Sequence, residues 1–250
     1  MKDNIIEFLY PEKTEKLVND IFPEPSLKHV PKWFKELKHS KEIPTVKGCM
    51  PFLDSLTAGY IMKMPQDLYL EHNFTNEKGE KDSSFRYSFH DSQQLVTRYK
   101  FNVNTKEKDC HNPRQLGPKC PFHDKNKELP FYKILNPFAI KTPPGYSCLF
   151  VPPLNNHDDR FEIISGIVDT DTYEGEVNLP IIINGDKYPT LETVIKRGTP
   201  LAQVIPFKRE SWKMVIKERP LHEGVLGFFQ IKKFLVNNYK RLFWKKKKWN

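Results

Sequence analysis

Residues 166–207 carry the strongest β-pattern of the chain and read GIVDTDTYEGEVNLPIIINGDKYPTLETVIKRGTPLAQVIPF. The β-branched run Val177–Ile183 predicts a buried strand, and the Asn184-Gly185 pair after it is typical of a two-residue hairpin turn. A second turn is predicted at Arg197-Gly198, followed by a strand over Leu201–Phe207. The stretch therefore predicts short antiparallel strands joined by tight turns.

The composition extends this β-pattern to the whole chain. The 250 residues include 21 prolines against 11 glycines, with 18 phenylalanines and 10 tyrosines. Such a composition favours short strands and stiff turns over long helices. We expect a mainly β domain over residues 49–220, an N-terminal extension over residues 1–48 and a basic C-terminal helix over residues 221–250.

Local patterns predict further elements outside the 166–207 stretch. A proline at position 31 is suited to the start of a short helix whose apolar face contains Trp33, Phe34 and Leu37. An exposed hairpin-like segment is expected at Asn76–Asp82. Strands are predicted over residues 5–10, 61–71, 83–103, 147–151 and 213–216.

The basic charge is concentrated at the C-terminal end. The formal net charge is +9, but residues 231–250 hold eight Lys and Arg and no Asp or Glu, so the other 230 residues carry 32 basic against 31 acidic groups. Apolar residues at helical spacing from Phe228 to Leu242 predict an amphipathic basic helix. Three roles stay open for this helix: docking on its own body, contact with a polyanionic partner such as nucleic acid, or contact with an anionic membrane.

No run of about 18 apolar residues is present, so the sequence predicts no transmembrane helix. The first residues are too acidic and too short in apolar length for a secretory signal. Four cysteines, at positions 49, 110, 120 and 148, are too few for a dense disulfide framework. These features indicate a reducing compartment.

One cluster contains the residue types that bind metals. Cys110, His111, Cys120 and His123 follow a C-H-x8-C-x2-H spacing and are candidate zinc ligands. The spacing lacks the paired C-x2-C knuckle that identifies most structural zinc sites. The alternative is a polar loop in which His111 and Gln115 form a local hydrogen bond.

Several segments resemble the motifs of the trimeric dUTPase and dCTP deaminase superfamily. A G-x-x-D-x-x-Y-x-G-E run, with one extra residue in its turn, and a later glycine turn with an A-Q strand lie in the order that this family shows. Two earlier segments, Thr57–Tyr60 and Thr142–Leu154, correspond to its first and second motifs. The matching residues of the later motifs are Gly166, Asp169, Tyr173, Gly175, Glu176, Gly198, Ala202 and Gln203.

The resemblance implies a β-clip or distorted β-barrel that binds a nucleotide, with sites between the subunits of a homotrimer. In that case Asp169 would activate water and Tyr173 would stack on the sugar or base, with Gln203 nearby. Asp171 or Glu176 would assist a magnesium ion. A monomer is the alternative to the trimer, because the apolar segments at both chain ends offer cover for exposed strand edges.

Three departures from the family pattern place hydrolysis in doubt. Ile61 stands where the first motif continues with an aspartate, and Val151–Leu154 offers neither a charge nor a hydroxyl to phosphates. The glycine-rich C-terminal arm is replaced by lysine-rich sequence. We therefore expect a binding or structural module that has lost nucleotide hydrolysis. The alternative is a nucleotide enzyme with a rearranged site, whose phosphates meet Arg160, Arg197 or the C-terminal lysines.

The chain also resembles a family of phage and bacterial proteins of similar length that has no established activity. The resemblance lies in the segments PKWFKEL, CMPFLDSLTAGY, KTPPGYSCLFVPPLN and RGTPLAQVIPFKRESW, which begin at residues 31, 49, 141 and 197. It implies a phage-type protein located in the host cytoplasm or in the virion.

Overall fold

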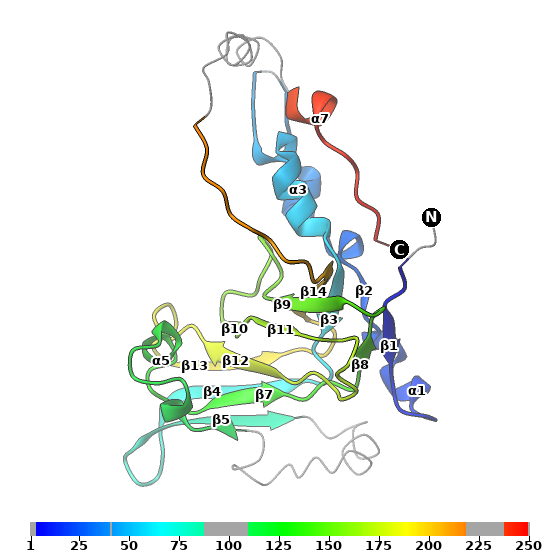
Figure 1. Ribbon diagram of the computed structural model, residues 1–250. Coiled ribbons are helices and arrows are strands. Elements are labelled where there is room, and N and C mark those ends of the chain that lie inside the picture. Colours follow the sequence, from blue (N-terminus) through cyan, green and yellow to red (C-terminus); the bar gives the residue numbers. More distant parts are fainter. Residues whose placement is uncertain (1–3, 41, 88–109, 219–237, 250) are drawn as a thin grey trace.

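The largest sheet is built around the long strand β14 (Pro200–Lys208), which lies between β3 (Tyr60–Lys63) and β9 (Tyr146–Val151). Strands β11 (Gly166–Val168) and β2 (Glu24–Pro25) form its two edges (Figure 1). The computed structural model describes residues 4–40, 42–87, 110–218 and 238–249. Leu201, Ala202, Gln203 and Val204 of β14 are all buried, so this strand is covered on both faces.

Three smaller sheets complete the described part of the chain. The first has the strand order β13 (Leu191–Ile195), β4 (Leu68–Thr75) and β5 (Lys81–Tyr87). The second pairs β1 (Glu7–Leu9) with β8 (Ala139–Lys141). The third has the order β10 (Phe161–Ile163), β12 (Leu179–Ile183), β7 (Phe131–Ile134) and β6 (Cys110–His111). Every strand pair is antiparallel.

The prediction of a mainly β protein is confirmed. Among the described residues the strands form four separate sheets, and none of these sheets closes into a barrel. Residues 76–80 of the predicted hairpin-like segment form the turn between β4 and β5, residues 81 and 82 already belong to β5, and the segment is mostly exposed as predicted. Residues 88–103, where the predicted second strand continues, lie outside the described residues.

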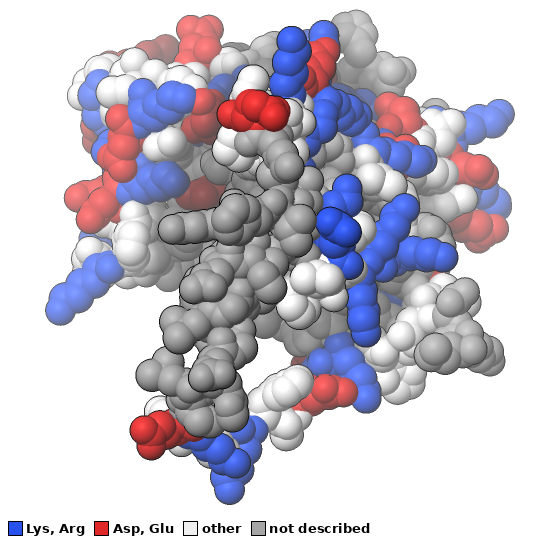
Figure 2. All heavy atoms as spheres, turned by 90° about the horizontal axis from the view of Figure 1, so that it is seen from above, with Lys and Arg blue, Asp and Glu red and all other residues white. Residues whose placement is uncertain are grey.

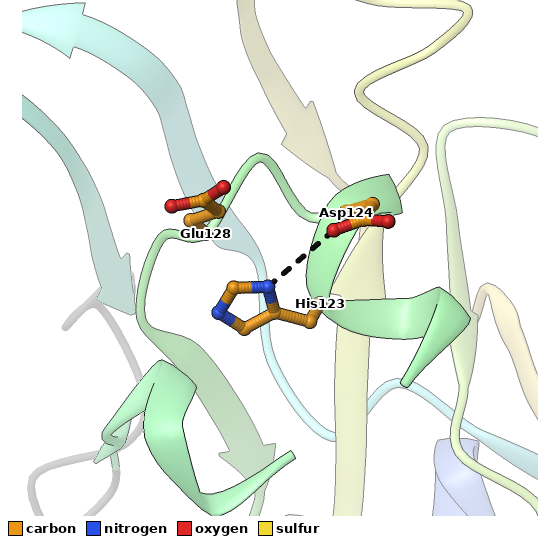
Figure 3. Close-up of side chains that lie close together, drawn as sticks. All are labelled: His123, Asp124 and Glu128. Atoms are coloured by element: carbon orange, nitrogen blue, oxygen red, sulfur yellow. Dashed lines mark ion pairs between the residues drawn. The ribbon is translucent and has the colours of Figure 1, made fainter. Parts of the chain in front are cut away.

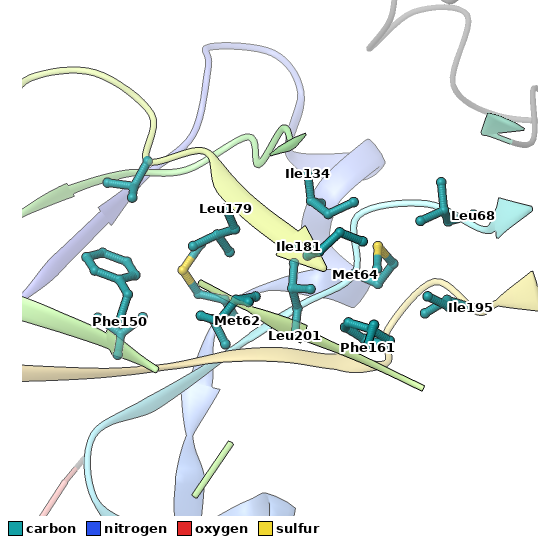
Figure 4. Packing of buried hydrophobic residues seen from close by; sticks show 14 of the residues in the cluster. Met62, Met64, Leu68, Ile134, Phe150, Phe161, Leu179, Ile181, Ile195 and Leu201 are labelled. Atoms are coloured by element: carbon teal, nitrogen blue, oxygen red, sulfur yellow. The ribbon is translucent and has the colours of Figure 1, made fainter. Parts of the chain in front are cut away.

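Apolar side chains from different sheets meet in one core (Figure 4). Met62 of β3, Phe150 of β9, Leu179 and Ile181 of β12 and Leu201 of β14 belong to it, and each is at most 2% exposed. Burial of apolar surface from each of these strands stabilises the fold by about 25 cal/mol per Å2. The core therefore joins the small sheets to the large one.

The helices are short. They are α1 (Glu15–Val18), α2 (Lys32–Glu36), α3 (Met50–Thr57), α5 (Pro121–Lys125) and α7 (Asn238–Leu242), with 3₁₀ turns at residues 19–21, 26–29, 46–48 and 113–115. No helix in the described ranges has the length and apolar character needed to span a membrane. Helix α2 follows Pro31 as predicted; its Phe34 is buried, whereas Trp33 is 49% exposed.

Helix α3 was not predicted from the sequence. It stands above the sheets in Figure 1 and packs against α2, where the rings of Phe52 and Phe34 stack at 5.7 Å. Leu56 is buried in the same small cluster as Phe34 and Val30. A proline near its start provides the fixed backbone angle that suits the first helical turn.

The prediction of a hairpin turn at Asn184-Gly185 is wrong. The strand before it, β12, pairs with β7 and β10, whereas the strand after it, β13, pairs with β4. The Gly185 amide instead donates to the Lys125 carbonyl at 2.9 Å, and a Cβ on Gly185 would lie 2.8 Å from that oxygen. Glycine is needed here for a close backbone approach rather than for a tight hairpin.

The strand predicted at Lys213–Ile216 is also absent. These residues form no ladder with any described strand and are fully exposed, with Met214 and Ile216 84% and 87% accessible. Of the predicted basic C-terminal helix, residues 221–237 lie outside the described residues. The described remainder is helical only over α7, and residues 244–249 continue without helix.

Gly59 allows β3 and β14 to approach each other. Its φ angle is +62°, and a Cβ at this position would lie 2.0 Å from the Val204 carbonyl oxygen. The Gly59 carbonyl also accepts a hydrogen bond from the Ser26 amide at 3.0 Å. The turn between α3 and β3 therefore has room for glycine alone.

Substitution of Gly59 tests this contact. We expect Gly59→Ala to lower the free energy of unfolding by about 2 to 5 kcal/mol, because a left-handed backbone angle and a steric overlap add together. Gly79→Ala is the matched control, since Gly79 has a φ of +79° and a Cβ there would meet nothing within 4 Å. It should cost about 1 to 2 kcal/mol. If urea denaturation gave the same decrease in the free energy of unfolding for both variants, the close approach of residue 59 to Val204 would not contribute to stability.

Candidate functional site

Two of the segments that resemble the superfamily motifs, Thr57–Tyr60 and Thr142–Leu154, meet at one end of the large sheet. Tyr60 on β3, Tyr146 on β9 and Pro206 on β14 line a cleft of about 800 Å3. Phe8 on β1 and Trp249 near the C-terminus complete its walls. The N-terminal strand and the C-terminal end lie close to this end of the sheet in Figure 1. We call this the aromatic cleft, defined by the rings of Phe8, Tyr60, Tyr146 and Trp249.

The rings of the aromatic cleft hold one another in place. Phe8 and Trp249 each meet the Tyr60 ring edge-on, at centroid distances of 5.5 and 6.3 Å. Burial raises the pKa of Tyr60, so its hydroxyl stays protonated. Lys248 is the charged side chain among the lining residues. The cleft therefore combines aromatic faces with one ammonium group.

Asp171 lies beside the cleft in a network that orders the start of β9. Its carboxylate accepts hydrogen bonds from the Gly145 amide at 2.8 Å and from both terminal nitrogens of Arg209 at 2.8 and 2.5 Å. The Arg209 hydrogen bonds, and then that of Gly145, lower the pKa of Asp171 from 3.8 to about 2. Only 6% of the Asp171 side chain is exposed. The Asp171 carboxylate therefore links the turn before β9 to the residue that follows β14.

Asp169 remains at the surface, with 62% of its side chain exposed. Its Oδ1 accepts a hydrogen bond from Ser147 Oγ at 2.6 Å and lies 3.2 Å from Arg209 Nη1. A carboxylate in contact with water and a neighbouring guanidinium has the residue types for general base catalysis. Asp169 does not line the aromatic cleft.

Tyr173 and Glu176 close the turn that follows Asp169. The Tyr173 amide donates to the Asp169 carbonyl at 2.9 Å, and its hydroxyl donates to the Glu176 carbonyl at 3.3 Å. A Cβ on Gly175 would lie 2.9 Å from the Tyr173 hydroxyl, the far end of a half-exposed side chain. Tyr173 is 48% exposed, and neither Tyr173 nor Glu176 lines the aromatic cleft.

Gln203 is buried, and its side-chain amide hydrogen-bonds to three backbone groups. Its amide nitrogen donates to the carbonyls of Ser55 and Ala58 at 2.9 and 2.6 Å, and its oxygen accepts from the Leu154 amide at 2.8 Å. The two carbonyls belong to the C-terminal end of α3, where a helix lacks its own donors. Gln203 is 1% exposed. Its side chain therefore ties α3 and the loop after β9 to β14.

The two arginines considered for phosphate binding are also engaged elsewhere. Arg160 forms a fork with Asp158 at 2.9 and 2.6 Å and donates to Thr193. Arg197 donates to both oxygens of Asp20 and to the Leu17 carbonyl, which joins the N-terminal region to the β13–β14 turn. Neither arginine lines the aromatic cleft.

Arg209 and Ser147 were missed in the sequence analysis, although both contact Asp169. Arg209 follows the A-Q pair by six residues, within the segment RGTPLAQVIPFKRESW. Its amide donates to the Gly145 carbonyl at 2.8 Å, which extends the contact between β14 and β9 by one residue. The only available signal was its position at the end of a strand that pairs with the second motif.

Among the described side chains, His111, Cys120 and His123 do not form one group of potential metal ligands. His111 Nδ1 lies 3.0 Å from Gln115 Oε1, so the predicted local hydrogen bond is present, and its ring stacks on Phe131 at 4.7 Å. Cys120 is a free cysteine at the start of α5, and only the backbone of Cys110 belongs to the described residues.

His123 instead lies beside two carboxylates (Figure 3). Potential ligand atoms of His123, Asp124 and Glu128 all lie within 4.8 Å of one another. His123 Nδ1 is buried and forms no hydrogen bond, and Asp124 Oδ1 is 3.5 Å away. Both carboxylates are exposed, so water competes for any cation. The arrangement is an open set of three potential ligands.

No family model matches the sequence, and no curated protein matches it significantly.

Replacement of Gln203 tests its structural role. We expect Gln203→Leu to lower the free energy of unfolding by about 3 kcal/mol, because three backbone groups lose a partner while the side-chain volume is nearly kept. Gln115→Leu serves as the control, since this glutamine is exposed and its side chain hydrogen-bonds to His111, and its effect should stay within about 0.5 kcal/mol. Similar losses for both variants in chemical denaturation would contradict the role of Gln203.

The Arg209–Asp171 pair predicts a pH dependence of stability. Because the pKa of Asp171 is depressed to about 2 in the folded protein, its contribution is present above pH 3.8 and is lost as the pH falls towards 2. We expect the stability difference between wild type and Arg209→Gln to shrink over this interval. In an Asp171→Asn background the difference should lose most of its pH dependence. A difference that is constant from pH 6 to pH 2.5 would contradict the pairing.

Proposed function

We propose that the protein is a phage-type, dUTPase-like β-clip module that binds a ligand in the aromatic cleft without hydrolysing nucleotides. The observation that carries the proposal is the engagement of Gln203. In this chain its amide bonds to three backbone groups and is 1% exposed, so it has no group left for a ligand. The residue that matches the family's A-Q strand thus supports the scaffold.

The walls of the aromatic cleft favour a planar ring as ligand. Tyr60, Tyr146 and Trp249 offer ring faces and edges, and aromatic groups stack on such surfaces with useful energy. Asn4 donates to the Tyr146 hydroxyl at 2.8 Å, which fixes that ring at the cleft entrance. Lys248 supplies a positive charge. A nucleotide combines a planar ring with negative charge, and the resemblance of Thr57–Tyr60 and Thr142–Leu154 to nucleotide-binding motifs supports this choice.

The burial and the hydrogen bonds of the acidic residues support a loss of nucleotide hydrolysis. Asp171 is 6% exposed at its side chain and accepts three hydrogen bonds, so it has little room for a magnesium ion. Asp169 Oδ1 accepts a hydrogen bond from Ser147 and forms an ion pair with Arg209. The second candidate function, a nucleotide enzyme with a rearranged site, is favoured by one observation: Asp169 is 62% exposed beside the cation Arg209.

Turnover and binding assays separate the two functions. We expect purified full-length protein with Mg2+ to release no product from dUTP, dCTP or the corresponding ribonucleotides above the level of Asp169→Asn. Calorimetric titration with dUMP should show binding that Tyr60→Ala weakens at least tenfold, because one stacking wall is removed.

Tyr69→Ala is the control for this titration, since Tyr69 is an exposed tyrosine on β4 that lies outside the cleft. It should leave the affinity unchanged within twofold. Turnover that depends on Asp169 would support the enzyme instead. Equal effects of Tyr60→Ala and Tyr69→Ala would overturn the aromatic cleft as the binding site.

A further inference from the structure

A second concave surface lies at the opposite end of α3 from the sheets. It is a groove of about 640 Å3 between the residues that follow α2, the first turn of α3 and α7. Phe34, Leu37 and Leu53 provide apolar lining, and three lysines, Lys38, Lys47 and Lys240, outnumber the one acidic lining residue, Glu36. We call it the basic groove, defined by these three lysines. It joins residues from the N-terminal region to residues near the C-terminus, about 200 positions apart in sequence.

Positive charge extends from the basic groove along the C-terminal residues. Residues 238–249 contain six Lys and Arg and no Asp or Glu. Lys240, Arg241, Lys245, Lys246 and Lys248 are exposed, and none of them forms an ion pair within the described part of the chain. Figure 2 shows the molecule from above the view of Figure 1. Basic side chains gather near the middle of this upper face, and acidic side chains lie mostly towards its margins. The face therefore attracts polyanions.

The C-terminal residues are held in a defined place rather than projecting as a free tail. Trp244 Nε1 donates to both carboxylate oxygens of Asp54 on α3, at 3.0 Å each, and Lys247 Nζ donates to Asp54 Oδ2 at 2.6 Å. Lys47 Nζ in turn donates to the Lys35 carbonyl at 2.6 Å, which fixes the other wall. The remaining lysines are thus presented by an ordered surface, which lowers the entropy cost of binding an extended anion.

Two exposed aromatic rings belong to α2 and α7, the helices that contribute Phe34 and Lys240 to the groove, although neither ring lines the groove itself. Tyr239, adjacent to Lys240 on α7, is 48% exposed. Trp33 is 49% exposed and packs edge-on against Phe34, a residue of the groove, at 5.7 Å. Positive charge along a groove, with aromatic faces beside it, is the combination that binds single-stranded nucleic acids through phosphates and stacked bases.

We infer that the basic groove binds single-stranded nucleic acid. Concavity favours this partner over an anionic membrane, because a bilayer surface cannot enter a groove between α2, α3 and α7. Exposed rings favour a single strand over a duplex, since the bases of a duplex are stacked on one another and are not available to Trp33 or Tyr239. Binding would be largely independent of sequence, because phosphates and ring faces are common to all strands.

Fluorescence anisotropy with labelled dT20 and full-length protein tests the inference. We expect binding at 50 mM salt whose affinity falls as salt rises. The double variant Lys38→Glu/Lys240→Glu should bind at least tenfold more weakly, and the slope of log affinity against log salt should fall in magnitude by about 1.4, or about 0.7 for each lost phosphate contact. Tyr239→Ala should weaken binding about tenfold through loss of stacking.

The control variant Lys78→Glu/Lys119→Glu changes net charge by the same amount, at exposed lysines that do not line the groove. It should retain wild-type affinity within about twofold. An equal loss in both double variants would overturn the groove as the site, because net charge alone would then explain binding. Stronger binding to anionic phosphatidylserine vesicles than to dT20 would also overturn the inference and indicate a membrane partner.

The aromatic cleft is tested separately in the same assay. Tyr60→Ala should lower dT20 affinity by less than Lys38→Glu/Lys240→Glu does, since Tyr60 does not line the basic groove. A loss of dT20 binding in Tyr60→Ala, with no loss in the groove variant, would move the nucleic-acid site to the aromatic cleft and contradict the inference. Thermal melting of each variant confirms that an altered affinity does not arise from unfolding.

Discussion

The close contact between Gly59 and the Val204 carbonyl fixes the relation between α3 and the large sheet. A side chain at residue 59 would overlap with the β14 backbone, so β3 pairs with β14 directly after the helix ends. Gln203, the neighbour of Val204, then reaches the free carbonyls at that helix end. One strand thereby sets the position of α3, and α3 carries both Asp54, which anchors the C-terminal residues, and part of the basic groove.

The same contact gives a structural role to residues that match the superfamily motifs. The glycine of Thr57–Tyr60 and the glutamine of the A-Q strand are needed for packing and for backbone hydrogen bonds in this chain. Asp171 likewise joins the turn before β9 to the end of β14 through Arg209. Such residues stabilise the fold whether or not a reaction depends on them, because an unpaired buried backbone group costs about 1 to 3 kcal/mol. The sequence pattern and the proposed loss of hydrolysis are therefore compatible.

Local sequence signals predicted the elements that depend on local interactions. The β4–β5 hairpin, the strand β14 and the start of α2 follow from turn residues, alternation and a proline. Asn184-Gly185 was misinterpreted because its glycine serves a contact with the distant Lys125 carbonyl. Arg209 was missed for the same reason, because it contacts Asp171 and Gly145, which are far from it in sequence. For the same reason the aromatic cleft was not predicted, because it requires both chain ends; the acidic turn that was predicted, with Asp169, Tyr173 and Glu176, does not line it.

Native-state hydrogen exchange at the Leu154 amide tests the central claim most directly. This amide lies in a loop outside the strands and donates to Gln203 Oε1 at 2.8 Å. If Gln203 is a permanent structural link, the amide should exchange as slowly as those of the core strands β9 and β14, through global unfolding. Exchange at the rate of the neighbouring loop amides would show that Gln203 opens in the native protein, and would contradict the account in which this residue supports the scaffold rather than a ligand.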